Sequence, residues 1–528
     1  MKRPFPLHPL LMAAYPVLFL YGINQIHFPV TIIFLPLIFL LLATLAAWAL
    51  LCLVFRSMYK AGLLTTLLLF IVFSHVAVRT LLKTLEFRIL GHLVGANEML
   101  LILWLILAAG VIAALFRTKS SPDGWTKTVN VVTLFLVVFS IGKIGLSAIR
   151  NGSFQKHGTA EVTEEPVKVS PRYDCDIYYI ILDGYARADI LEKVYHFDNR
   201  PFLDFLADHG FKVAAGSNSN YIQTILSMAS SLNFTYLDDL KDMPTTDRQP
   251  AVRMIQDNRL FRMLREAGYE IVTFASGYYG TEIRKSDLFL KPSHGNRWMS
   301  LHLNEFQNGL LRMTLFPLLS SRLFSKKVDF AAQHRNLTLY ILNRLREIPG
   351  WKGERNRFVF SHIVCPHPPF VLNERGESLQ PPGEEDFNDG SHLVKGSFST
   401  DDYKRGYLGQ LRFINEQMEE IIRGILEESK KPAIIILQAD HGPGSGLNWE
   451  DPQQSLLSER FSILNAYHFP REVAEEIPDG ITPANSFRLV LNHLFDSQLP
   501  LLENRSYFSK WSNPYGFIDV TEEVRPGR

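Results

Sequence analysis

Two stretches of the chain place a carboxylate directly after a largely apolar run. Asp183 follows the run 177–182, and Asp440 with His441 follows the run 432–438. Such runs are typical of strands that are covered on both faces of a parallel sheet. Open parallel sheets have their binding sites at the carboxyl ends of the strands. We therefore expect the two carboxylates and the imidazole to face one cleft, although an Asp in this position can also simply cap the next helix.

A hydroxyl group adds a third kind of chemistry. The segment 216–233 passes from a polar loop into a helix-like run of small and apolar residues, and Thr224 lies near the expected start of that helix. Backbone N–H groups and the helix dipole favour an anion there. A hydroxyl in this position becomes a nucleophile when a nearby cation lowers its pKa. Taken alone, Thr224 is more typical of an ordinary helix cap than of a nucleophile.

Together these four side chains could hold a divalent cation. Asp183, Thr224, Asp440 and His441 offer three oxygens and one nitrogen. Carboxylates combined with imidazole suit zinc or manganese, and they suit magnesium less well. The two carboxylates would balance the charge of the metal. We expect such a metal to hold the Thr224 oxygen and a phosphoryl oxygen together.

The elements that must position these residues lie after residue 172. Strand-like runs alternate there with amphipathic helical patterns, which predicts an α/β/α sandwich with a mostly parallel central sheet in residues 173–528. The expected strands are 176–182, 269–275, 357–364, 432–438 and 461–467, and the clearest helical patterns are 185–194, 200–209, 257–267, 328–347 and 401–428. Residues 151–172 are polar, contain Gly and Pro, and are expected to form a linker.

The first 150 residues have a different character. Five apolar runs, near 9–25, 29–54, 61–81, 97–116 and 128–148, each approach the roughly 20 residues that a helix needs to cross a bilayer. We therefore expect a five-helix transmembrane domain. Seven Lys and Arg residues near the ends of these runs would lie on the same side of the membrane as the N-terminus, and four would lie on the opposite side. This excess favours an N-terminus inside the cell. Five spans would then place residues 173–528 on the outer side of the cytoplasmic membrane.

The net charge excludes one class of partner. The 528 residues carry a net charge of only +1, so no basic excess points to nucleic acid. A further stretch, 309–324, is apolar but interrupted by Arg312 and Arg322. It could be a core helix of the α/β domain, or it could lie on the membrane surface and help to collect a lipid substrate.

This combination resembles the alkaline phosphatase/sulfatase superfamily, in particular its membrane-anchored branch of lipoteichoic acid synthases and phosphoethanolamine transferases. The resemblance rests on the N-terminal spans, Asp183 at the end of the first strand, Thr224 about forty residues later, and Asp440-His441-Gly442 after a late strand. It implies that Asp183, Asp440 and His441 are metal ligands. It also implies that Thr224 takes a substituted phosphoryl group, of phosphoglycerol or phosphoethanolamine type, from a membrane phospholipid and passes it to a glycan or lipid acceptor.

The chain departs from the family pattern in two places. The transferases and synthases usually carry Glu where this chain has Asp183. Sulfatases carry paired Asp there, and they carry a Cys or Ser followed by Pro and Arg where this chain has Thr224-Ile-Leu-Ser-Met. The second difference argues against a sulfatase. Ser227 stays a rival nucleophile.

The stretch 361–370 contributes one more candidate. In related transferases a His before a Pro-aromatic sequence contacts the substrate phosphate, so the resemblance implies a substrate-binding role for His367; the alternative is a structural loop histidine. His362 is expected to be structural. Arg460 is expected to lie on the surface, with a phosphate contact as the alternative.

The leading hypothesis is therefore a membrane-anchored, metal-dependent phosphotransferase with a covalent Thr intermediate. One alternative is a phosphodiesterase or phosphatase of the same superfamily, for which water is the only acceptor. An alternative of another class is a metal-binding membrane module without turnover.

Overall fold

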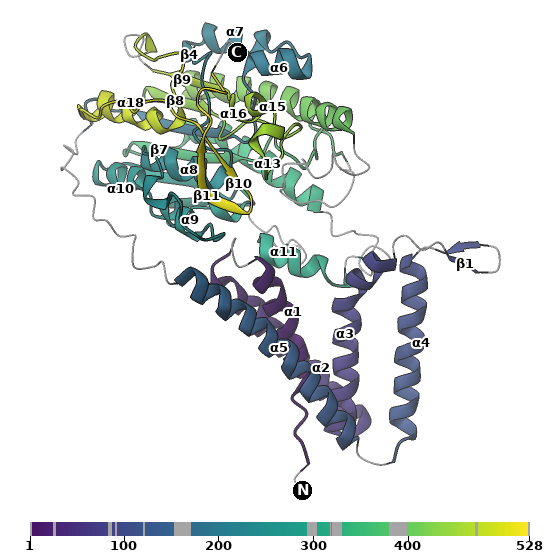
Figure 1. Ribbon diagram of the computed structural model, residues 1–528. Coiled ribbons are helices and arrows are strands. Elements are labelled where there is room, and N and C mark those ends of the chain that lie inside the picture. Colours follow the sequence, from purple (N-terminus) through teal and green to yellow (C-terminus); the bar gives the residue numbers. More distant parts are fainter. Residues whose placement is uncertain are drawn as a thin grey trace. The chain divides into compact units, whose positions relative to one another are not determined.

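The protein consists of two units that are described separately. The first contains Met1–Ser153 and Leu301–Asp329, and the second contains Phe154–Ser300 and Phe330–Arg528. The computed structural model (Figure 1) describes residues 3–24, 28–82, 87–89, 92–94, 96–119, 122–152, 171–292, 304–316, 318, 330–379, 399–469 and 474–525. The predicted boundaries at 150 and 172 stay predictions, because most of the expected linker lies outside these residues.

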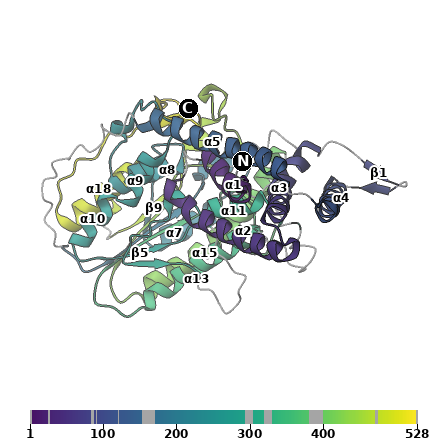
Figure 2. The ribbon, with the colours of Figure 1, turned by 90° about the horizontal axis from the view of Figure 1, so that it is seen from below.

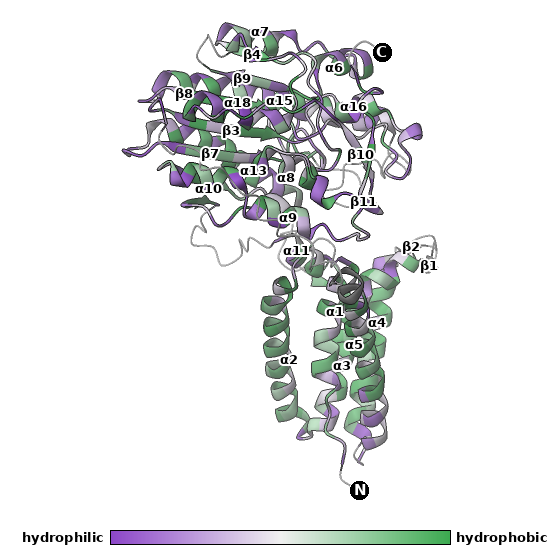
Figure 3. Ribbon diagram, turned by 60° about the vertical axis from the view of Figure 1, so that its left-hand side comes forward, coloured by the Kyte–Doolittle hydropathy of each residue, from purple (hydrophilic) through white to green (hydrophobic). Residues whose placement is uncertain are grey.

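The first unit is built from apolar helices. They are α1 (His8–Asn24), α2 (Phe34–Phe55), α3 (Met58–Leu82), α4 (Ala96–Arg117) and α5 (Asp123–Gly152), with the short elements η1 (Val30–Ile33), β1 (Phe87–Ile89) and β2 (His92–Val94) between them. Figure 3 shows that most residues of these helices are hydrophobic. Large apolar side chains such as Leu53 and Leu105 face outward, exposed to 76% and 70%. Such a surface suits lipid better than water.

Four segments of this unit are long and apolar enough to cross a membrane. They are Val30–Phe55, Met58–Leu82, Asn97–Arg117 and Asp123–Leu146. The remaining helix, α1, has 17 residues, which at about 1.5 Å per residue cover about 26 Å of a hydrocarbon core that is about 30 Å thick. The prediction of an N-terminal set of apolar helices before an α/β domain is confirmed.

A piece of the later chain also belongs to the first unit. Helix α11 (Glu305–Arg312) begins with a capping box formed by Asn304 and Gln307. Phe306 packs edge-on against Phe28, with ring centroids 5.6 Å apart, and the N–H of Leu315 donates to the carbonyl of Val72 at 2.8 Å. The described part of the stretch 309–324 therefore packs with the apolar helices and is not a core helix of the α/β domain.

The second unit contains a seven-stranded sheet in the order β4-β9-β8-β3-β7-β5-β6. Strand β9 runs antiparallel to its two neighbours, and the other paired strands are parallel. In chain order the elements are β3 (Asp176–Leu182), α6 (Ala188–Tyr195), α7 (Arg200–Asp208), β4 (Phe211–Val213), α8 (Thr224–Asn233), η2 (Asp238–Leu240), α9 (Gln249–Gln256), α10 (Arg259–Glu266), β5 (Glu270–Phe274), η3 (Tyr279–Thr281), β6 (Leu288–Leu290), α13 (Phe330–Glu347), η4 (Ile348–Gly350), β7 (Arg357–Ile363), α15 (Thr400–Glu428), β8 (Ala433–Gln438), η5 (Pro452–Gln454), α16 (Leu457–Phe461), β9 (Asn465–His468), α18 (Pro483–Phe495), β10 (Tyr507–Lys510) and β11 (Asn513–Asp519).

Helices cover both faces of this sheet. Alternate residues of β3 enter two separate cores, because successive side chains of a strand point to opposite faces. Tyr178, Ile180 and Leu182 pack in the core formed with α6, α7, α13 and α15, and the intervening residues pack with α8, α9, α10 and α18. Helices α13 and α15 lie side by side on the first face (Figure 2). The predicted α/β/α sandwich with a mostly parallel sheet is confirmed.

The centre of the sheet determines where the site lies. Strand β3 pairs in parallel with β7 on one side and with β8 on the other. The carboxyl ends of these three strands therefore meet at one edge of the sheet. The last predicted strand starts later than expected, at Asn465 instead of 461, because α16 extends to Phe461 and Ser462 and Ile463 form isolated bridges with Asn218 and Ala186.

Candidate active site

Asp183 is the first residue after β3 and lies in a closely packed site. Its side chain is almost fully buried, with 3% exposure. Gly184 turns the chain immediately afterwards with a φ of +75°, a left-handed conformation that favours glycine. The Asp183 carboxylate reaches two imidazoles: Oδ2 accepts a hydrogen bond from His362 Nε2 at 3.1 Å, and Oδ1 lies 3.6 Å from His441 Nε2. The carboxylate thus faces into the molecule and does not merely cap a helix.

Asp440 and His441 follow β8 and face the same point. The N–H of Gly184 donates to Asp440 Oδ1 at 3.3 Å, which joins the two strand ends directly. His441 Nε2 lies 3.3 Å from Asp440 Oδ2. The other ring nitrogen of His441 donates to the carbonyl of Gly442 at 3.0 Å. This bond leaves the lone pair of Nε2 directed at the carboxylates.

Glycine is required after His441 because the backbone passes very close to a neighbouring segment. A Cβ atom on Gly442 would overlap the carbonyl oxygen of Glu459. The Gly442 N–H donates to the carbonyl of Arg460 at 2.7 Å. The sequence Asp-His-Gly therefore combines two candidate metal ligands with the one residue that permits this close contact.

Thr224 is the first residue of α8, as the sequence predicted for a residue near the start of that helix. Its Oγ1 lies 3.0 Å from His441 Nε2. Thr224 is only half-buried, whereas Asp183, Asp440 and His441 are buried. Ser227, the rival nucleophile, is buried and donates to the backbone carbonyl of Asp440 at 2.7 Å. Of the two hydroxyls, Thr224 is the one that reaches both solvent and the cluster.

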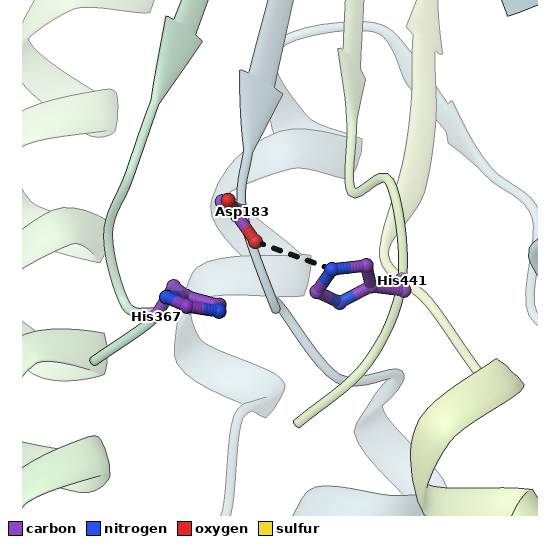
Figure 4. A group of neighbouring side chains, drawn as sticks. All are labelled: Asp183, His367 and His441. Atoms are coloured by element: carbon purple, nitrogen blue, oxygen red, sulfur yellow. Dashed lines mark ion pairs between the residues drawn. The ribbon is translucent and has the colours of Figure 1, made fainter. Parts of the chain in front are cut away.

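His367 joins the cluster from the loop after β7 (Figure 4). Its backbone N–H donates to the carbonyl of Asp183 at 3.0 Å, and its Nδ1 donates to the carbonyl of Pro368 at 2.6 Å. Ligand atoms of Asp183, His367 and His441 all lie within 4.8 Å of one another. The structure therefore brings together all five residues that the sequence singled out: Asp183, Thr224, His367, Asp440 and His441.

His362 also lies in this cluster, where the sequence had suggested only a structural residue. It lies in β7 opposite Ile181 of β3, one position before the end of both strands. Asp183, His362 and Asp440 form a second group whose ligand atoms lie within 4.8 Å of one another. The signal available in the sequence was a histidine near the end of a strand predicted to pair beside Asp183. The expectation that His362 is structural stays a prediction, and its contact with Asp183 Oδ2 places that role inside the site.

The electrostatics of the site suit a bound cation. Burial and the nearby Asp183 raise the pKa of Asp440 to about 7. Burial alone would also raise the pKa of Asp183, but His367 and the hydrogen bond from His362 outweigh it and hold that pKa below its usual range. Burial and the positive charge of Arg460 lower the pKa of His441 well below its ordinary value, so its imidazole is neutral.

Two oxygens of the site lack a protein donor. Within the described ranges, Asp183 Oδ1 and Asp440 Oδ2 are buried and accept no hydrogen bond. Buried carboxylate oxygens are normally paired, because an unpaired one is costly. A divalent cation bound by these two oxygens, His441 Nε2 and Thr224 Oγ1 would satisfy them, and the donor set is one that zinc or manganese accepts. The residues present therefore fit a metal.

Arg460 is buried, which corrects the expectation of a surface residue; its exposure is 2%. Its guanidinium donates twice to the carbonyl of Ile222, at 2.7 and 3.0 Å, and once to the carbonyl of Gly442, at 3.0 Å. Arg460 thus connects the segment just before Thr224 to the residue just after His441. These bonds use three of the five N–H donors of the guanidinium on backbone carbonyls.

Comparisons with known proteins indicate the family of the chain. The family model described as Sulfatase matches residues 176–470, which is more than half of the chain. No curated protein matches the sequence.

Several solved structures are similar. The C-terminal periplasmic domain of EcEptC from Escherichia coli, in complex with Zn, has a TM-score of 0.42 at 12% identity and covers 69% of this chain and 98% of its own. The integral membrane protein lipooligosaccharide phosphoethanolamine transferase A from Neisseria meningitidis has a TM-score of 0.41 at 10% identity. The match covers 93% of this chain and 96% of that protein. A putative sulfatase from Bacteroides thetaiotaomicron has a TM-score of 0.36 at 10% identity. The match covers 62% of this chain and 72% of that protein. With TM-scores below 0.5, these likenesses do not by themselves establish a shared site.

Proposed function

The chain belongs to the sulfatase family, and from this premise we propose that it is a membrane-anchored, metal-dependent phosphotransferase. It moves a substituted phosphoryl group, of phosphoglycerol or phosphoethanolamine type, from a phospholipid to a glycan or lipid acceptor. The observation that carries the proposal is the position of the Thr224 hydroxyl. Oγ1 lies 3.0 Å from His441 Nε2, at the first residue of α8, beside two buried carboxylates.

The residues that would hold the metal are Asp183, Asp440, His441 and Thr224. Zinc or manganese is the best match to three oxygens and one nitrogen, with magnesium as the weaker fit. When bound, the cation supplies positive charge that favours the alkoxide of Thr224 and stabilises charge on the phosphoryl oxygens. The backbone N–H groups at the start of α8 add to this stabilisation of an anion.

The reaction divides into two displacements at phosphorus. In the first, Thr224 Oγ1 loses its proton and forms a bond to phosphorus, while the bond from phosphorus to the diacylglycerol oxygen breaks and that oxygen takes a proton. In the second, a hydroxyl of the acceptor loses its proton and bonds to phosphorus, and Thr224 leaves and is reprotonated. Both steps are nucleophilic substitutions that share one covalent intermediate.

His367 is assigned a substrate-binding role. Its Nδ1 donates to the carbonyl of Pro368, which leaves Nε2 for contacts in the site. A protonated Nε2 can donate to a phosphoryl oxygen, and a neutral Nε2 can take the proton from an incoming hydroxyl. The ring centroids of His367 and His441 lie 6.0 Å apart, so both imidazoles are close enough to act on one bound group.

The apolar helices supply the membrane attachment. With α1 as a fifth span, the charge distribution near the helix ends favours residues 173–528 on the outer side of the cytoplasmic membrane. Protease added to sealed, right-side-out vesicles should then degrade the second unit while the apolar helices are protected. Degradation only after the vesicles are opened would refute this orientation.

The test of the function uses the full-length protein in vesicles of phosphatidylglycerol and phosphatidylethanolamine that carry a labelled head group. With Mn²⁺ or Zn²⁺, we expect release of diacylglycerol and transient label on the protein at Thr224. Thr224→Ala should abolish both, and Thr224→Ser should keep part of the activity. Label transferred to a membrane lipid or an added glycan supports a transferase. Release to water alone supports the phosphodiesterase alternative, and no release from either lipid overturns the proposal.

A further inference from the structure

One face of helix α15 contacts the three loops that carry Asp183, His367 and Asp440-His441. Tyr403, Tyr407 and Gln410 lie four and three positions apart, so at about 100° per residue their directions fall within about 60° of one another. All three are fully buried. We refer to these three side chains as the polar face of α15. Polar side chains in the middle of a helix need partners when they are buried, and here each finds them in a different loop.

Tyr407 holds the loop that follows Asp183. Its hydroxyl accepts a hydrogen bond from the N–H of Ala186 at 3.0 Å and donates to the carbonyl of Gly184 at 3.1 Å. Burial raises the pKa of Tyr407 well above its ordinary value, so the hydroxyl keeps its proton and can do both. The two backbone groups flank the turn that directs the Asp183 carboxylate into the site.

Gln410 holds the loop that carries His367. Its Nε2 donates to the carbonyls of Pro366 and His367, at 3.2 and 3.1 Å. Its Oε1 accepts from the N–H groups of Val371 and Leu372, at 2.9 and 3.3 Å. One amide thus makes four hydrogen bonds to one loop, which is its full capacity.

A glycine allows this loop to approach α15. A Cβ atom on Gly406 would overlap the ring of Phe370 from the same loop. Glycine inside a helix costs about 1 kcal/mol relative to alanine. A glycine occurs at this position of the helix because the ring of Phe370 leaves no room for a side chain.

Tyr403 holds the loop that follows His441. Its hydroxyl accepts from the N–H of Gly444 at 3.1 Å, three residues after His441. The ring of Tyr403 also packs edge-on against Phe370, with centroids 5.2 Å apart. The polar face of α15 therefore connects the loops after β3, β7 and β8. These three loops are far apart in the sequence.

We propose that Tyr403, Tyr407 and Gln410 are positioning residues, which set the distances between the Asp183, His367 and His441 side chains from outside the site. The proposal deepens the function proposed above and rests on it. Pairing between the strands determines where each strand ends, but the site residues lie one to four positions beyond those ends. A metal and phosphoryl site tolerates errors of only about 0.5 Å, and supporting hydrogen bonds supply such accuracy.

The experiment compares Tyr403→Phe and Tyr407→Phe with Tyr269→Phe in the full-length protein in detergent. Tyr269 is an equally buried tyrosine whose hydroxyl lies 3.8 Å from Cys175 Sγ, at the opposite edge of the sheet. Each change removes one oxygen and keeps the ring. The affinity for Mn²⁺ is measured by competition with a chelator, and the melting temperature and amide hydrogen exchange are measured on metal-free protein.

We expect Tyr403→Phe and Tyr407→Phe to weaken Mn²⁺ binding about 10- to 100-fold, the usual effect of losing a residue that supports metal ligands. Tyr269→Phe should bind Mn²⁺ like the wild type, at a comparable fall in melting temperature. Tyr407→Phe should also speed exchange of the Ala186 amide, and Tyr403→Phe that of Gly444. Gly406→Ala should weaken Mn²⁺ binding without removing any polar atom.

Unchanged Mn²⁺ affinity in both tyrosine variants would overturn the positioning role, even if the wild type is active. If the wild type binds no metal and releases no diacylglycerol, the proposed function fails instead. The hydrogen-exchange comparison then decides the remaining claim alone: unchanged exchange at Ala186 and Gly444 would show that α15 does not hold these loops.

Discussion

Replacing His362 tests how the carboxylate of Asp183 is held. His362 is buried and lies between two partners: its Nε2 is 3.1 Å from Asp183 Oδ2, and its Nδ1 is 2.7 Å from Thr281 Oγ1. Ser276 Oγ is in turn 2.9 Å from Thr281 Oγ1. A carboxylate can only accept, so Nε2 carries the proton, and the Thr281 hydroxyl donates to Nδ1. We therefore expect His362 to orient Asp183 and not to bind the metal itself.

The expected magnitude follows from this one hydrogen bond. A hydrogen bond to a charged group contributes about 1.5–3 kcal/mol, and 1.36 kcal/mol corresponds to a factor of ten. Asp183→Ala is too severe to separate orientation from ligation, whereas His362→Ala leaves the ligand in place and removes its support. His362→Ala should therefore weaken Mn²⁺ binding about 10- to 100-fold.

A second substitution distinguishes orientation from ligation. The amide nitrogen of Gln can occupy the position of Nε2 and donate to Asp183, but an amide is a poor replacement for an imidazole ligand. His362→Gln should therefore recover most of the affinity that His362→Ala loses. His468→Ala serves as the control, because His468 bonds to the carbonyl of Ala433 at the opposite edge of the sheet. Chelator competition with the full-length protein gives the affinities.

The result that would refute this reasoning is specific. If His362→Gln binds Mn²⁺ as weakly as His362→Ala, then His362 is a ligand and not a support for Asp183. If both variants bind like the wild type, the hydrogen bond to Asp183 does not contribute to the site at all.

Four further predictions concern the residues of the site and those that support them. Because the pKa of Asp440 is raised to about 7, protons compete with the cation for this carboxylate below that pH. The rise in melting temperature on adding Mn²⁺ should therefore be larger at pH 8 than at pH 6. Equal rises would contradict the role of Asp440 as a metal ligand. In the metal-free protein, the folded state holds the Asp440 proton up to a higher pH than the unfolded state does. The free energy of unfolding therefore falls as the pH rises from the ordinary pKa of an aspartate towards 7. The contribution of Asp440 to the melting temperature should be greater at pH 5 than at pH 8. Gly442→Ala should lower both Mn²⁺ affinity and melting temperature, because its Cβ would overlap the Glu459 carbonyl, whereas Gly424→Ala on the open side of α15 should leave affinity unchanged and raise stability by up to about 1 kcal/mol. Arg460→Lys should reduce diacylglycerol release about tenfold or more, because one ammonium cannot match the planar fork that bonds Ile222 and Gly442; activity equal to the wild type would show that the bridge between these two loops is unnecessary.

The main strands and the candidate ligands were accessible from the sequence. Apolar runs predict buried strands, and the carboxyl ends of neighbouring parallel strands must share one edge of the sheet. Asp183 and Asp440 could therefore be expected to meet, although 257 positions separate them. The apolar N-terminal helices were equally clear, because their composition alone determines where they are stable.

The supporting residues were not accessible in this way. The contact between His362 and Asp183 depends on the register of β3 against β7. The role of Arg460 depends on which backbone carbonyls lie beside its guanidinium. The segment around α11 has the composition of a core helix, and only its contacts assign it to the first unit.

What the sequence determined by itself is thus the local conformation and the chemistry that each strand carries to its end. Period and composition act over a few residues, so they are readable without the fold. What only the tertiary structure decided is which side chains from elsewhere hold those ends in place. The bond between Tyr407 and Ala186 joins residues 221 positions apart, and no local pattern encodes a partner at that distance, because the pairing arises only when the strands and α15 pack together.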